Sequence, residues 1–159
     1  MCSRLPGATL AVALSLLAAW SCQPVSRPRI VRPRPSAPHQ VMAIAGPTLG
    51  SGEIRPTDCT SGQHRMFFGA DLSADPPVLV LRVIIDPLDG PVVRVFKASD
   101  PYGASIVARR RDCKTLNLRF LPTGSSVNFV NEMKLSLEVD CETLAHDFIV
   151  GEISAEACG

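Results

Sequence analysis

The segment from Met133 to Cys141 alternates strictly between apolar and polar residues. In the order MKLSLEVDC, every second residue is apolar, and lysine, serine, glutamate and aspartate stand between them. A period of two puts the apolar side chains on one face of a β-strand, whereas a helix would spread them around its surface. The segment therefore predicts a strand with one face on a core and the other on solvent.

Similar short patterns recur after about residue 57. They predict strands at 64–72, 78–86, 92–97, 104–108, 114–120, 133–141 and 147–155. Turn residues at 86–91 and 99–103, rich in aspartate, proline and glycine, separate some of them. About seven strands, with no convincing helical stretch, predict an all-β fold, either an antiparallel β-sandwich or a small barrel.

The N-terminus reads as a secretory signal peptide over residues 1–21. Arg4 supplies the positive charge, and Ala8 to Trp20 is an uninterrupted run of 13 apolar or small residues. A membrane-spanning helix needs about 20 such residues, so this run is too short to cross a bilayer. We therefore expect an exported protein whose first 21 residues are removed.

Residues 22–56 read as a tether before the folded domain at 57–159. Four arginines alternate with five prolines in the part from 23 to 38: Arg27, Arg29, Arg32 and Arg34, with Pro24, Pro28, Pro33, Pro35 and Pro38. Proline removes backbone donors, so this part predicts an extended spacer, whose arginines could also settle on anionic lipid headgroups. Residues 39–56 are ambiguous, because the apolar run 41–45 is followed by several glycines, and we assign them to the linker.

The net charge of +1 conceals an asymmetry. From residue 57 onward, 14 carboxylates outnumber ten lysines and arginines, which gives this part a charge of −4. Aromatic residues make up only 5% of the chain, too few for a platform on which bases stack. Nucleic acid is therefore not an expected partner.

The cysteines left after removal of the signal peptide are odd in number. Cys22, Cys59, Cys113, Cys141 and Cys158 remain, and acylation of Cys22 would leave four for two disulfides. If 114–121 pairs with 134–141, Lys114 lies opposite Cys141, and Cys113 is close to it. The hairpin that follows carries Cys158 to the far end of the sheet, roughly 30 Å away at about 3.3 Å per residue. We therefore predict the pairs Cys113–Cys141 and Cys59–Cys158.

The search for reactive groups returns no catalytic, metal or cofactor site. The cysteines lack the close spacing of zinc ligands, and His64 and His146 fit an edge and a turn. The run Arg109–Arg111 is interpreted as solvated charge, with phosphate or polysaccharide binding as the alternative. Three aspartates lie in predicted turns, where a pair could act in glycoside cleavage: Asp86, Asp89 and Asp100.

The residues Ala19-Trp20-Ser21-Cys22 resemble the lipobox of bacterial lipoprotein precursors, in which the cysteine receives the lipid. Gln23 stands where an inner-membrane retention signal would have aspartate, so the resemblance implies the outer membrane. The strand ending in Val139-Asp140-Cys141 and the closing segment from Gly151 to Cys158 look similar to the disulfide-stapled β domains of uncharacterised bacterial lipoproteins. This resemblance implies a location and no activity.

Three functions follow from these observations. The first is a lipid-anchored, non-enzymatic protein of the bacterial cell envelope that binds another envelope protein or a polysaccharide. The second is a small secreted or envelope hydrolase that acts on glycans through turn carboxylates. The third is a freely secreted or periplasmic binding protein, if Cys22 carries no lipid.

Overall fold

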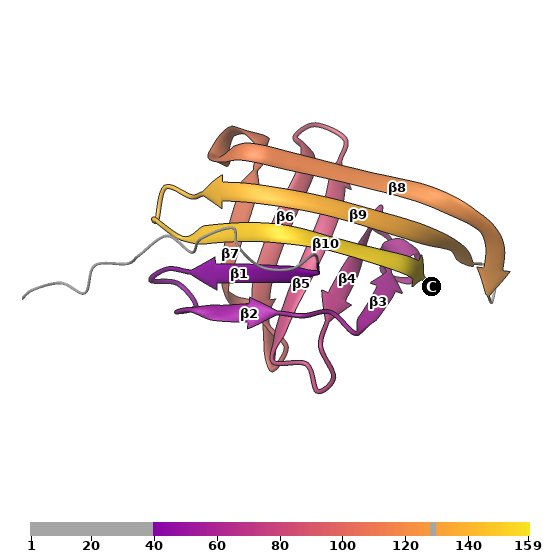
Figure 1. The fold of residues 1–159 in the computed structure, drawn as a ribbon, viewed down its shortest axis with the longest axis horizontal. Coiled ribbons are helices and arrows are strands. Elements are labelled where there is room, and N and C mark those ends of the chain that lie inside the picture. Colours follow the sequence, from indigo (N-terminus) through magenta and orange to yellow (C-terminus); the bar gives the residue numbers. More distant parts are fainter. Residues whose placement is uncertain (1–39, 128–129) are drawn as a thin grey trace, which may run out of the picture.

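A computed structural model describes residues 40–127 and 130–159, which form two antiparallel sheets of five strands each (Figure 1). Sheet A contains β1 (Val41–Ala45), β2 (Gly52–Ile54), β8 (Cys113–Val127), β9 (Val130–Glu142) and β10 (Phe148–Cys158). Sheet B contains β3 (Asp58–Ser61), β4 (Gly69–Ser73), β5 (Leu79–Asp86), β6 (Gly90–Lys97) and β7 (Asp100–Arg109). The predicted signal peptide, Cys22 and the Arg/Pro segment lie outside the described residues. The all-β fold is confirmed.

The two sheets differ in how the chain builds them. Sheet B has the order β3-β4-β5-β6-β7, so every strand pairs with its neighbour in sequence. Sheet A has the order β2-β1-β10-β9-β8, which places the first described strand beside the last. In Figure 1 the strands of sheet A run steeply across those of sheet B, as in orthogonally packed β proteins.

The core lies between the sheets, on the faces that the alternation predicts. Leu135, Leu137 and Val139 of β9 are buried in it, while the residues between them point outward. Leu81 and Val83 of β5 meet them from sheet B within the same core cluster. The strict pattern at 133–141 is therefore a one-sided strand, as predicted.

The assignment of residues 39–56 to the linker is wrong for residues 41–54, which form β1, β2 and the turn between them. β1 pairs with β10 from Val41 to Ala45, and its Met42 and Ile44 are buried in the core. The glycines that suggested a linker form the hairpin turn between β1 and β2. Gly151 of β10 allows the backbone of β1 to approach closely, because a Cβ atom at this position would lie 2.1 Å from the Val41 carbonyl oxygen. The folded domain thus includes residues 41–54 as well as 57–159.

Smaller differences between the predicted and the observed strands have local causes. The predicted strand 64–72 is shorter than expected, because a 3-10 helix (η1, Gly62–Arg65) occupies its start and β4 begins only at Gly69. The Ser61 hydroxyl caps this helix by accepting from Gln63 N. A second 3-10 helix (η2, Arg110–Asp112) joins β7 to β8. The described residues form ten strands rather than about seven, since β1, β2 and β3 are too short to show a period. No helix among the described residues is long and apolar enough to cross a membrane.

Both predicted disulfides are present, and each has one cysteine next to an irregularity in strand pairing. Cys59–Cys158 joins sheet B to sheet A, and Cys113–Cys141 joins two neighbouring strands of sheet A. The predicted register holds along β8 and β9, but an irregularity at Lys114 brings Cys113, rather than Lys114, opposite Cys141.

A second irregularity between Ala155 and Cys158 turns Cys158 toward the core, where it is 1% exposed. A bulge inserts residues into one strand and thereby changes which side chains face inward. Both cysteines reach their partners for this reason. The two disulfides indicate an oxidising compartment, as in extracellular or periplasmic proteins.

Candidate binding surface

The outer face of sheet B carries a row of charged side chains in direct cross-strand register. Asp71 of β4 lies opposite Arg82 of β5, and Arg82 lies opposite Arg94 of β6. The strand period of two points all three away from the core, because Leu72, Leu81 and Val95 beside them point into it. Sheet register alone therefore assembles a charged group from three strands.

Asp71 is the centre of this group. Arg82 binds it in a bidentate manner, with Nε donating to Oδ1 at 2.7 Å and the second nitrogen donating to Oδ2 at 2.8 Å. Arg65, from η1, also pairs with Oδ2 of Asp71. The side chain of Asp71 is only 9% exposed and that of Arg82 21%, whereas Arg65 is 56% exposed. Arg65 thus has solvent-facing donors while Arg82 is held in place.

Two phenylalanines surround the Arg82 guanidinium. Its central carbon lies 4.8 Å from the ring centroid of Phe67 and 5.2 Å from that of Phe96. Arg94 lies 5.0 Å from the Phe96 centroid and donates to the Pro101 carbonyl at 2.9 Å. Phe96 points away from the core and is nevertheless only 3% exposed. These cation–π contacts fix the arginines in defined positions.

The electrostatics of the group favour charged arginine. The hydrogen bond to Asp71 raises the pKa of Arg82 above its usual value, against the opposing effect of burial. The charge of Asp71, and more weakly the nearby Tyr102, act in the same direction. Arg82 is therefore a cation at physiological pH.

A recess of about 330 Å³ lies over this group. Its charged members are Asp58, Arg65, Asp71 and Arg82, and hydroxyl groups come from Thr60 and Ser73. Such a lining offers both donors and acceptors to a polar ligand.

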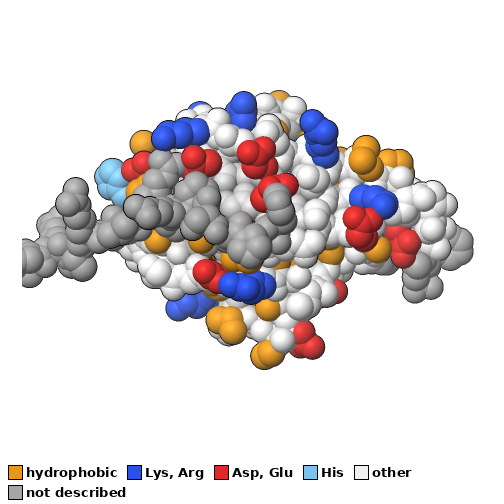
Figure 2. Space-filling view, in the orientation of Figure 1, with side chains coloured by type: hydrophobic (Ala, Val, Ile, Leu, Met, Phe, Trp, Pro, Cys, Tyr) orange, Lys and Arg blue, Asp and Glu red, His pale blue; other side chains and the backbone are white. Residues whose placement is uncertain are grey.

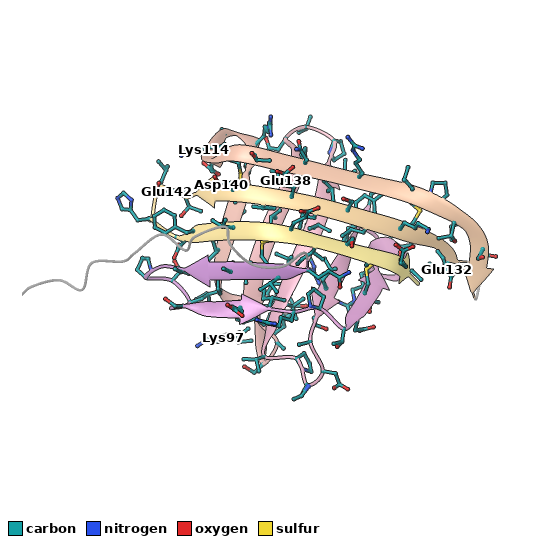
Figure 3. The ribbon with its side chains drawn as sticks, in the orientation of Figure 1. Lys97, Lys114, Glu132, Glu138, Asp140 and Glu142 are labelled. Carbon is teal, nitrogen blue, oxygen red and sulfur yellow. A yellow bond between two sulfur atoms is a disulfide. The ribbon has the colours of Figure 1, made fainter. Side chains whose placement is uncertain are left out.

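A second recess, of about 660 Å³, begins on the other side of Pro77, which lines both. It lies between β2 of sheet A and the start of β5, and its lining is mainly apolar: Leu49, Ile54, Pro76, Pro77, Val78 and Leu79. Glu53 and Lys97, the latter labelled in Figure 3, add one charge of each sign. Together the two recesses form a surface that is polar on one side of Pro77 and apolar on the other. We call it the Pro77 surface.

The three aspartates considered for glycoside cleavage lie at two ends of sheet B. Asp86 and Asp89 occupy the β5–β6 turn, where Asp86 accepts from Leu88 N and Asp89 N, and Asp89 pairs with Arg109 at 2.9 Å. These two backbone hydrogen bonds lower the pKa of Asp86. Asp100 lies opposite Lys97 at the other end of β6. Asp100 is therefore separated from the other two by the length of a strand, more than 20 Å at about 3.3 Å per residue.

The remaining candidates lie in a turn and in the two 3-10 helices. His146 occupies the β9–β10 turn with a positive φ of 61°, and its Nδ1 lies 3.1 Å from a Glu142 oxygen. In the arginine run, Arg110 donates to the Leu116 carbonyl and Arg111 lies 3.9 Å from Asp112. His64 belongs to η1. Among residues 40–127 and 130–159, His, Cys, Asp and Glu side chains form no group that could hold a metal ion.

Sequence reasoning did not find the Asp71–Arg82 group. A single arginine in an otherwise apolar strand, as in LVLRVIID, was the available signal, because burial of a cation requires a partner. The partner comes from another strand, so the register was needed to identify it. Comparison of the chain with protein-family models, with curated proteins and with solved structures gave no match.

Proposed function

We propose that the chain is a lipid-anchored protein of the bacterial outer membrane, and that its disulfide-stapled domain binds another envelope protein. One observation carries the anchor. All four cysteines of the folded domain are paired with one another, in Cys59–Cys158 and Cys113–Cys141. Cleavage before Cys22 therefore leaves that thiol without a cysteine partner in the same chain, which fits acylation of Cys22.

The binding role is supported by the Pro77 surface. Its apolar recess suits an aliphatic or aromatic side chain, and its polar recess presents Arg65 to a carboxylate or a carbonyl. Among the described residues, the apolar recess has an aliphatic and proline lining with no aromatic ring on which a sugar could stack, which favours a protein segment over a glycan. Arg65, 56% exposed in the polar recess, is of a residue type that contributes strongly to protein interfaces.

The anchor is tested by Cys22→Ser. This variant should move from the membrane fraction to the soluble envelope fraction, because several acyl chains hold a lipoprotein in the bilayer. Intact-mass measurement of the unaltered chain from membranes should show the added lipid. Tight membrane association of the variant would contradict the anchor.

The binding role is tested by a photo-crosslinking residue at position 78 in cells that make the full chain. Val78 is 72% exposed and lines the apolar recess. Leu88, 96% exposed in the turn at the other end of β5, is the matched control. We expect a discrete protein adduct from position 78 and none from position 88. Adducts at both positions, at neither, or with glycan alone would reject a protein partner at this surface.

A further inference from the structure

The outer face of sheet A carries a row of apolar side chains that do not belong to the core. These are Val41, Ala43 and Ala45 of β1 with Phe148 and Val150 of β10. Val41, Ala45, Phe148 and Val150 are each less than 9% exposed, yet none belongs to the core cluster. Their neighbours Met42, Ile44 and Ile149 do. Because side chains alternate across a strand, the apolar row points away from the core, and the core does not cover it.

A row of carboxylates runs beside these apolar side chains. Glu138, Asp140 and Glu142 follow one another along the outer face of β9, and Glu152 of β10 lies opposite Glu138 and Val41 (Figure 3). Figure 2, which looks onto this face, shows acidic side chains gathered over sheet A. Asn117 donates to Glu138 at 2.9 Å, and the Nδ1 atom of His146 lies 3.1 Å from a Glu142 oxygen. Lys114 of β8 lies at the end of the row.

We propose that this face is the docking site of the chain's own Arg/Pro segment, residues 23–38. The segment has the complementary pattern, since Ile30 and Val31 lie between one pair of arginines, Arg27 and Arg29, and another, Arg32 and Arg34. The aliphatic pair matches the apolar row, and the arginines match the carboxylates. The segment holds four cations and no anion, and the row beside the apolar side chains holds four carboxylates.

The path of the chain puts the segment within reach. Gln40 donates its backbone N–H to Glu152 O at 2.8 Å, so the described part of the chain begins beside the carboxylate row. Arg34 is six residues upstream of Gln40, and at about 3.1 Å per residue it reaches about 19 Å. Glu138 lies two strands from Val41, which is about 10 Å at roughly 4.8 Å per strand.

The spacing of charges also agrees. Glu138, Asp140 and Glu142 occur at every second residue, about 6.6 Å apart along the strand. Arg27 and Arg29, like Arg32 and Arg34, are also two residues apart, which is about 6.2 Å along an extended proline-rich chain. The two arginines of each pair can therefore face two successive carboxylates of β9 while both segments stay extended.

Trypsin provides a reporter within the segment. Three of its arginines precede proline, which trypsin does not cut, and only the Arg29–Ile30 bond is cleavable there. In the chain purified from an oxidising compartment, docking should slow this cleavage. The rate of cleavage at Arg29–Ile30 should rise about tenfold or more in the variant Glu138→Gln/Asp140→Asn/Glu142→Gln, which we call the acidic-row variant. It should also rise at high salt, which screens surface charges.

The matched control neutralises three carboxylates elsewhere, in the variant Asp58→Asn/Asp75→Asn/Glu132→Gln, and should leave the rate unchanged. Equal cleavage in the unaltered chain and the acidic-row variant would overturn the proposal. So would protection of Arg29–Ile30 that appears only when vesicles of anionic phospholipid are added, because the arginines would then bind lipid.

A second measurement does not depend on cleavage. Changing all four arginines to glutamine alters no described residue, so it cannot disturb the core directly. We expect the Tm to fall by several degrees, and we expect no further fall when the acidic-row variant is added. Independent, additive losses would mean that the two sets of residues do not interact.

Discussion

The outer faces of the two sheets balance their charges in different ways. On sheet B, Asp71 is enclosed by Arg82 and Arg65, and the guanidinium of Arg82 is packed against phenylalanine rings. On sheet A, the carboxylates Glu138 and Asp140 follow one another along a strand and border an apolar row. The first face is neutralised by register within its own sheet, whereas for the second we propose neutralisation by the arginines of residues 23–38. A charged face can thus be either a structural network or an attachment site.

The largest expected effect concerns how the two sheets are joined. Replacing Cys59 and Cys158 by alanine releases a crosslink between residues 99 apart and should cost about 4.7 kcal/mol in the free energy of unfolding. Replacing Cys113 and Cys141 releases one between residues 28 apart, within sheet A, and should cost about 3.6 kcal/mol. Urea unfolding of both double variants measures the difference. The reverse order would show that sheet A, and not the junction, is the weaker part.

The second prediction compares the loss of stability when one ion pair is broken on each face. Asp71→Asn removes the charge that balances Arg82, which is largely buried, and should cost about 2 to 3 kcal/mol. Glu156→Gln breaks the exposed pair with Lys134 on sheet A and should cost less than about 0.5 kcal/mol. Similar losses from both variants, read from the urea midpoints, would remove the distinction between a structural network and a solvated pair.

The smallest effect lies in the pH dependence of the β5–β6 turn. Two backbone N–H groups hold the pKa of Asp86 below its usual value, so its charged form is favoured in the folded protein. The stabilisation is present above the unfolded pKa, near about 4, and is lost as the pH falls through the lowered folded value. The Tm of Asp86→Asn should therefore approach that of the unaltered protein as the pH is lowered from 7 to 3. A constant difference over this range would assign the effect to the turn geometry instead.

The sequence was sufficient for the features that depend on side-chain period. The alternation at Met133–Cys141 identified a one-sided strand, and its pairing with β8 followed in the predicted register. β1 was missed because five residues next to glycine and proline resemble a linker until the partner β10 is known. The bulges that turn Cys113 and Cys158 inward have no signal in residue type. Asp71 and Arg82 were not associated for a related reason, since 11 residues and a turn separate them.

The position of β1 beside β10 has a consequence for the order in which the polypeptide can acquire its structure during synthesis. Sheet B consists of successive hairpins, so each of its strands can pair as soon as the next has emerged. β1 can pair with β2 at an early stage, but its other edge must wait for Phe148–Glu152 of β10, and Cys59 must wait for Cys158. The nascent chain therefore presents one unpaired edge of the apolar strand β1 until β10 has been made. Any factor that shields Val41–Ala45 during this interval would act on the yield of folded protein and not on its final stability.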